Sequence, residues 1–165
     1  MTDKNINNPV HLIKSIINHP QGSIEALLGL INYGETDWLE LKASLRPENN
    51  ESEKGTNLHD YYWHVAKAVI ALANTRGGAV IIGIDDDGDP VGLEASDDPK
   101  RKYFNSGWDN FSRNVLVNTI CPESGWKCQK EGKIEISPIS TSLSSVIEYE
   151  YKKYKEKNVA VIYVT

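Results

Sequence analysis

Hydrophobic residues recur at helical spacing in three segments of the first half of the chain. Residues 9–17 carry apolar side chains three or four positions apart, behind a proline that suits the first turn of a helix. A second segment begins after Ser23, a residue type that caps helices, and a third covers residues 57–74. The glycines at 77–78 can adopt the positive φ angles that end a helix. The pattern therefore predicts three helices before the first long apolar run.

Strands are predicted where apolar residues alternate with polar ones or form a continuous run. In the segment 38–42 the two leucines share one face, and Trp38, Glu40 and Lys42 share the other. Residues 79–84 are almost all apolar, which is typical of a strand covered on both faces. Further elements are expected as a turn at 87–90, strands at 91–93, 133–139, 146–151 and 159–164, and a helix from residue 98. The predicted fold is α+β (α/β-like), with a mixed β-sheet flanked by helices.

Length and composition fit one domain with a sizeable core. The chain has 165 residues, of which 39% are hydrophobic and 25% charged. No apolar run reaches the roughly 18 residues of a membrane span, and the first residues lack the pattern of a signal peptide. We therefore expect a cytoplasmic protein with no membrane partner. The two cysteines, Cys121 and Cys128, match no common zinc spacing and are expected to be reduced thiols.

The charge is unevenly distributed. The formal net charge is −5, whereas nucleic-acid-binding proteins usually carry a basic excess that neutralises phosphates. Basic residues nevertheless gather in two clusters, at 100–102 and at 152–157, and acidic residues gather at 48–53 and 85–89. Either basic cluster alone also fits an ordinary solvated surface.

The segment 71–88 combines a helix end, a buried strand and a carboxylate cluster, so it indicates a site as well as a fold. Asp85 follows the strand, and Gly83 is expected to leave room beside it for a metal ion or a phosphate. Glu40 and Lys42 share a strand face, where a carboxylate can bind a divalent ion and an ammonium can contact a phosphate. A structural role also remains open, because charged residues keep a strand face soluble and Asp-Asp-Gly suits a turn.

Three motifs, in this order, resemble the Schlafen-type AlbA-like domain, once called the divergent AAA domain. They are residues 34–42, the helix end at 70–78, and the strand and turn at 81–88 with Val91-Gly92 behind it. The resemblance covers roughly residues 23–165 and implies the fold of that family, with residues 1–22 as an N-terminal helical extension. Bacterial and archaeal members commonly form the N-terminal part of transcriptional regulators or ATP-binding proteins. We therefore expect an N-terminal fragment of a longer protein, with the C-terminal domain of that protein as a partner.

The resemblance also implies nucleic-acid binding. Some Schlafens are ribonucleases that use two glutamates and one aspartate with a divalent metal. Carried onto this chain, the three positions are Glu35, Glu40 and Asp85. They would hold Mg²⁺ or Mn²⁺, and Lys42 would complete the catalytic site.

The sequence leaves parts of this site open. An acidic insert at 48–56 separates the motifs and shifts the spacing between Glu40 and the aspartates. Asp86 or Asp87 can therefore take the role assigned to Asp85. Glu35 lies five residues before Glu40, so in a continuous strand the two would face opposite sides, and a turn has to bring them together. No Gly-x-x-x-x-Gly-Lys-Ser/Thr motif occurs, so we expect no ATP site in this segment.

Three functions remain open at this point. The first is a nucleic-acid-binding module, for DNA or RNA, in a bacterial or archaeal regulator or defence protein. Its expected contacts are Lys100, Arg101, Lys102, Arg113, Lys152, Lys153 and Lys155. The second is a divalent-metal-dependent endoribonuclease with the Glu/Glu/Asp site. The third is a protein-interaction or dimerisation module, with a second copy of the chain as partner.

Overall fold

Three helices and six strands make up the part of the chain that the computed structural model describes, residues 9–32, 36–44, 58–93, 126–130, 133–137 and 147–165. In chain order they are α1 (Pro9–Ile17), α2 (Ile24–Leu30), β1 (Leu39–Lys42), α3 (Leu58–Ala73), β2 (Gly78–Ile82), β3 (Trp126–Lys130), β4 (Lys133–Ser137), β5 (Ile147–Tyr154) and β6 (Lys157–Val164). None of these helices is long and apolar enough to cross a membrane.

Four strands form a mixed sheet in the order β1-β2-β6-β5. β1 and β2 are parallel and joined through α3, with Glu40 opposite Val80. β6 is antiparallel to both of its neighbours, β2 and β5. β3 and β4 pair with each other as a separate two-stranded sheet. The predicted α+β fold with a mixed sheet and flanking helices is therefore confirmed.

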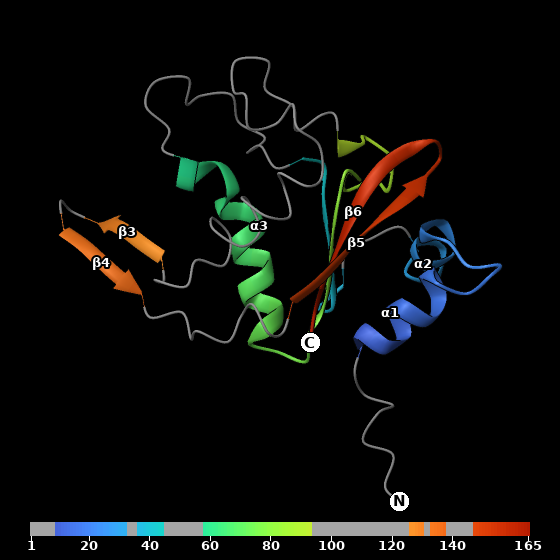
Figure 1. The fold of residues 1–165 in the computed structure, drawn as a ribbon, viewed down its shortest axis with the longest axis horizontal. Helices are drawn as coiled ribbons and strands as arrows, with labels where there is room; N and C mark the ends of the chain where they lie inside the picture. The colour runs from blue at the N-terminus through green and yellow to red at the C-terminus, as the bar shows by residue number, and fades with distance from the viewer. Residues whose placement is uncertain (1–8, 33–35, 45–57, 94–125, 131–132, 138–146) are drawn as a thin grey trace, which may run out of the picture.

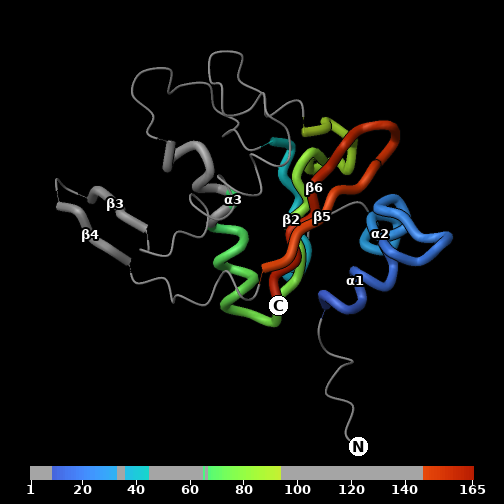
Figure 2. Tube along the Cα trace, in the orientation of Figure 1, coloured from blue at the N-terminus to red at the C-terminus, as the bar shows by residue number. Residues whose placement is uncertain are grey.

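The sheet is the middle of three layers, with α1 and α2 on one face and α3 on the other (Figure 1). Odd-numbered residues of β1, β2 and β6 point to α1 and α2 and share one core with them. Even-numbered residues of the same strands point to α3. β2 is buried at all five positions, as its apolar run predicts. Figure 2 shows the trace of β2 and β6 between the helical layers.

Local sequence signals explain where the helices begin and which faces they bury. The Ser23 hydroxyl accepts a hydrogen bond from the Ala26 amide at 3.1 Å and caps α2, as predicted. In α3 the buried residues include Val65, Val69 and Leu72, which recur every three or four positions. The packing of that stripe holds α3 against β2 and β6.

α1 is anchored to the far edge of the sheet by polar contacts as well as by the core. The Lys14 ammonium lies 2.6 Å from the Glu148 carboxylate and 4.9 Å from the centre of the Tyr163 ring. Lys152 donates a hydrogen bond of 2.6 Å to the side chain of Asn18. α1 thus shares the packing of α2, and the division of the domain at residue 22 stays a prediction.

The β5–β6 hairpin is longer than predicted. Strands were expected at 146–151 and 159–164, around a basic turn at 152–157. The strands instead extend to Tyr154 and begin at Lys157, so the turn is only Lys155 and Glu156. Both turn residues have positive φ angles, 44° and 67°, a conformation suited to two-residue hairpin turns. The predicted helix from residue 98 lies outside the described residues.

Two glycines allow the backbone of α3 to turn directly into β2. Gly77 has a φ of 79°, and a Cβ atom there would overlap the carbonyl oxygen of Val164. A Cβ atom on Gly78 would overlap the carbonyl oxygen of Trp38. The close approach of three backbone segments therefore requires glycine at both positions.

We expect Gly78→Ala to lower the free energy of unfolding by about 2 kcal/mol or more, because the new methyl group forces β1 and β2 apart. Gly29→Ala is the matched control. Gly29 lies in α2 with no neighbouring atom within 4 Å of the position of a new Cβ. The same substitution there should stabilise the protein by roughly half a kcal/mol. Urea denaturation followed by circular dichroism measures both, and equal effects would contradict the packing described for Gly78.

Candidate functional site

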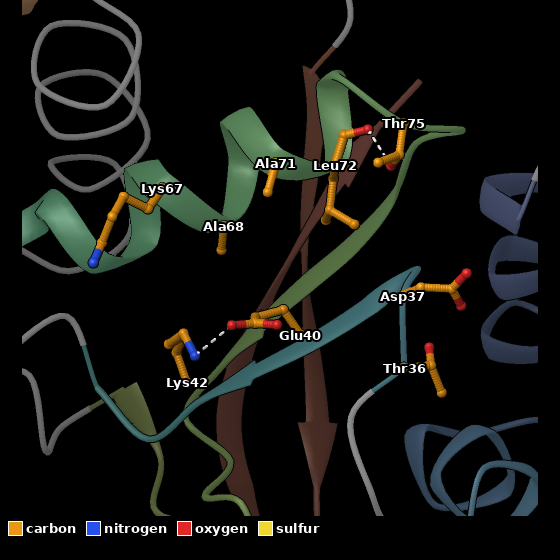
Figure 3. Close-up of a pocket in the computed structure, with 9 residues that line it drawn as sticks. All are labelled: Thr36, Asp37, Glu40, Lys42, Lys67, Ala68, Ala71, Leu72 and Thr75. Atoms are coloured by element: carbon orange, nitrogen blue, oxygen red, sulfur yellow. Dashed lines mark hydrogen bonds and ion pairs between the residues drawn. The ribbon is translucent and has the colours of Figure 1, made fainter.

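Glu40 and Lys42 lie side by side on the face of β1 that is turned to α3. Burial alternates along the strand, so Leu39 and Leu41 enter the core and the two charged side chains point the other way. The Lys42 ammonium lies 2.8 Å from the Glu40 carboxylate, and both side chains are partly exposed (Figure 3). The predicted pairing of a carboxylate and a cation on one strand face is therefore present.

The Glu40–Lys42 pair lines a pocket of about 440 Å³ between β1 and α3. Apolar side chains of α3 line one side of this pocket, from Ala68, Ala71 and Leu72. Polar groups come from both elements and the turns beside them, namely Thr36, Asp37, Glu40, Lys42, Lys67 and Thr75. Figure 3 shows the two lysines at one end and Thr36, Asp37 and Thr75 at the other. Charge is thus segregated along the length of the pocket.

A turn precedes β1 and decides which side chains reach the pocket. The Thr36 amide donates to the Leu39 carbonyl at 3.0 Å, and the Trp38 amide donates to the Thr36 hydroxyl at 3.3 Å. Because of this turn, Trp38 packs against the core shared with α1 and α2. Its predicted place on the same face as Glu40 is wrong. Glu35 lies outside the described residues.

Asp85 lies in a loop beyond the end of β2 and does not line the pocket. Its carboxylate accepts hydrogen bonds from the backbone amides of Asp87, at 3.1 Å, and Asp89, at 2.8 Å. The loop returns as the predicted turn, with a bridge between Ile84 and Pro90. The structural role that the sequence left open for this carboxylate is therefore realised, as side-chain capping of a turn.

Gly83 does not leave space for a metal ion or a phosphate. Its carbonyl oxygen accepts hydrogen bonds from the amides of Val91 and Gly92, both at 2.8 Å. A Cβ atom at Gly83 would lie 3.1 Å from the carbonyl carbon of Gly92 and 3.2 Å from a methyl group of Val159. The returning chain occupies the volume that the sequence interpretation assigned to a ligand.

The predicted three-carboxylate metal site remains a prediction. Within the described ranges, no three acidic, histidine or cysteine side chains gather closely enough to hold an ion. The pocket contributes Glu40 and Asp37, and Asp85, Asp86 and Asp87 lie in the loop after β2. A set that includes Glu35 falls partly outside these ranges.

The basic hairpin divides its lysines between the two faces of the sheet. Lys152 points to α1, where its ammonium contacts Asn18 and lies 3.2 Å from Glu150. Lys153, Lys155 and Lys157 are exposed. The other predicted nucleic-acid contacts, Lys100, Arg101, Lys102 and Arg113, lie outside the described residues.

Two exposed tyrosines lie in one row with Lys153 on a single face of β5. Tyr149 and Tyr151 are 39% and 41% exposed, on the same face of the strand as Lys153. The sequence interpretation missed them as surface residues, because they were counted only as part of an apolar strand. The signal was the alternation Tyr-x-Tyr-x-Lys, which puts all three side chains on one side.

A buried hydrogen bond holds the tip of the hairpin against the acidic loop. The Tyr154 hydroxyl donates to the Gly88 carbonyl at 3.0 Å. The Tyr154 side chain and, less strongly, the carboxylates of Asp89 and Glu25 raise the pKa of Lys155. On the same face of the sheet, burial raises the pKa of Tyr163, and so does the Glu150 carboxylate, which accepts a hydrogen bond from the Tyr163 hydroxyl. Basic and acidic groups therefore meet on the side of the hairpin that is turned to α2.

Comparison with known proteins identifies the family. The Schlafen AlbA_2 profile matches residues 35–165, so the chain belongs to that family, whose domains are often parts of larger regulators. No curated protein matches the chain. Among solved structures, the DIP2311 protein from Corynebacterium diphtheriae aligns at 18% identity, with a TM-score of 0.41, over 96% of this chain. The chain spans only 25% of the length of that protein.

We expect Asp85→Ala to destabilise the loop after β2 by about 1 kcal/mol, because two backbone amides lose their acceptor. Asp86→Ala is the matched control, since the Asp86 side chain is exposed and should change stability by less than about 0.5 kcal/mol. Hydrogen exchange of the amides of residues 87 and 89 reports the effect locally. Unchanged exchange in Asp85→Ala would show that the carboxylate does not hold the turn.

Proposed function

We propose that this domain binds nucleic acid through the β5–β6 hairpin, as one part of a larger regulator or defence protein. The observation that carries the proposal is the row of Tyr149, Tyr151 and Lys153 on one face of β5, which leads to the exposed Lys155 and Lys157 at the tip. Aromatic rings beside a basic surface are what proteins use to stack bases and neutralise phosphates.

The spacing of the tyrosines favours a single strand as the ligand. Alternate residues of a strand lie roughly 7 Å apart, so neighbouring unpaired bases can stack on Tyr149 and Tyr151. Each stacked base contributes on the order of 1–3 kcal/mol, and stacking accepts any base. In a duplex the base faces are already stacked on one another. The two rings therefore favour unpaired DNA or RNA over duplex.

The net charge of −5 is compatible with this proposal because the charges are segregated. Two carboxylates of β5, Glu148 and Glu150, point to α1, where each is paired with a lysine. Lys153 lies on the opposite face of β5. A strand that approaches from the side of α3 therefore meets Lys153 before it meets these carboxylates.

We expect the double change Lys153→Glu and Lys155→Glu to weaken binding of a single-stranded oligonucleotide at least 10-fold at about 0.1 M salt. Each lysine that contacts a phosphate also contributes about one unit to the slope of log affinity against log salt, so the slope should fall. Fluorescence anisotropy across a salt series measures both quantities, with EDTA present to separate binding from metal-dependent cleavage.

Lys152→Gln is the matched control on the same strand. Its ammonium is already held by Glu150 and Asn18, so its loss should leave affinity within about 2-fold. Equal losses for Lys152→Gln and the double change would mean that the hairpin acts through its fold and not through its exposed charges. Full binding by the double variant would reject the hairpin as the interface.

A divalent-metal-dependent endoribonuclease is the second candidate. The observation that favours it is that the carboxylates of Glu40 and Asp37 line one pocket with Lys42 and Lys67. Glu40 would be one metal ligand, with Glu35 and Asp85 as the further ligands that the family resemblance suggests. A bound Mg²⁺ or Mn²⁺ would polarise a phosphoryl oxygen and lower the pKa of water. Lys42 would orient the phosphate and hold the Glu40 carboxylate in place.

We expect Glu40→Gln to abolish cleavage of a structured RNA in Mn²⁺ or Mg²⁺, while circular dichroism and the unfolding midpoint stay close to wild type. The substitution keeps the shape of the side chain and removes its charge. Glu25→Gln is the control, because Glu25 is an exposed carboxylate on α2 that does not line the pocket. Cleavage that survives Glu40→Gln would eliminate the pocket as the catalytic site.

A further inference from the structure

We propose that the pocket between β1 and α3 holds a single unpaired nucleotide, whose phosphate lies between Lys42 and Lys67. The pocket has a volume of about 440 Å³, ample for one nucleotide, and a lining of mixed polarity. The inference rests on the proposed nucleic-acid binding and adds a second point of contact, separate from the hairpin, that selects unpaired nucleotides.

The lysine end of the pocket carries a net attraction for an anion. Lys42 is paired with Glu40, so these two charges largely offset each other. Lys67 is exposed on α3 at the same end of the pocket and forms no ion pair within the described part of the chain (Figure 3). A phosphate placed there gains the full interaction with Lys67, and Lys42 can turn toward it because its side chain is partly exposed.

The middle of the pocket suits a sugar or a flat base. The side chains that α3 presents there are two alanines and Leu72, which leave an apolar surface without protruding polar groups. Ala68 and Ala71 are small, so they leave the room between β1 and α3 that longer side chains would fill. An apolar wall with polar groups at its ends is the usual arrangement of a small-ligand site.

The far end of the pocket offers hydrogen-bonding groups of both kinds. The Thr75 hydroxyl donates to the Leu72 carbonyl at 2.9 Å, so its oxygen remains an acceptor. The Thr36 hydroxyl oxygen accepts from the Trp38 amide, so its hydrogen remains a donor. Asp37 is exposed and adds a carboxylate acceptor. These groups match the amino, imino and carbonyl groups at the edge of an unpaired base.

The pocket and the hairpin are separate contacts on the same face of the sheet. Along one cross-strand row, Lys42 lies opposite Ile82, and the row continues through Ala160 to Tyr151. Three strand spacings separate Lys42 from Tyr151, about 14 Å, and α3 packs on the two strands between them. A mononucleotide can therefore occupy only one contact, whereas a longer strand that passes around α3 can occupy both and gain avidity.

The test uses adenosine 5′-monophosphate as the probe, in the absence of divalent metal, with binding followed by NMR chemical-shift perturbation. Ala71→Phe fills the pocket from an exposed position of α3 and should weaken binding at least 5-fold. Lys67→Glu should do the same, and Lys67→Arg should restore binding because it keeps the positive charge. Adenosine, which lacks the phosphate, should bind the wild type more weakly than the monophosphate does. The variants that weaken binding should not show this difference between the two ligands.

Ala26→Phe is the matched control, because Ala26 is an exposed alanine on α2, on the opposite face of the sheet. It should bind the monophosphate as the wild type does, and so should the variant with Lys153→Glu and Lys155→Glu. Absence of monophosphate binding, or binding that Ala71→Phe and Lys67→Glu leave unchanged, would overturn the pocket assignment.

The outcome separates this inference from the proposed function. Oligonucleotide binding that depends on the hairpin lysines but not on Ala71 or Lys67 would support the proposed function and overturn the pocket. Monophosphate binding in the pocket without any oligonucleotide binding would support the pocket and overturn the proposed function. If oligonucleotide binding depends on the hairpin lysines and monophosphate binding depends on Ala71 and Lys67, both proposals hold. Ala71→Phe should then also reduce oligonucleotide affinity, because the strand loses one of two contacts.

Discussion

Burial of β2 on both faces is the constraint on which the other elements depend. All five of its residues are buried, with α1 and α2 on one side and α3 on the other. A strand covered in this way needs close neighbours along both edges, which β1 and β6 provide. The backbone crowding at Gly77 and Gly78 then fixes where α3 ends relative to β1. The width of the pocket between β1 and α3 follows from that spacing.

Edge position explains why charge can collect on β1 and β5 and not on the strands between them. Of the described strands, these two lie at the ends of the four-stranded order. The core takes Leu39 and Leu41 from β1, while α3 rests on the central strands and leaves room beside Glu40 and Lys42. A charged side chain at the equivalent positions of β2 would be buried beneath α3, where desolvation makes it costly.

Periodicity predicted the elements well, because burial imposes the period of each helix and strand on the sequence. α3 and β2 lie where their apolar stripe and run indicated. The errors arise where tertiary contacts decide. Trp38 leaves the expected face because a turn precedes β1, and Gly83 faces the returning backbone of Gly92 in place of a ligand. The pocket itself could not be predicted, because Lys67 and Thr75 line the same pocket as Glu40 only through the packing of α3 on the sheet.

Side chains alternate between the two faces of the sheet along β5, and this alternation gives the two faces different charges. Glu148, Glu150 and Lys152 point to α1 and satisfy one another's charges or those of α1. Lys153, the next residue after Lys152, points the other way, in line with the tyrosines. Lys42 and Lys67 lie on that same side of the sheet. The nucleic acid that we propose as the ligand would therefore meet these lysines on the face that carries α3, although the chain as a whole is acidic.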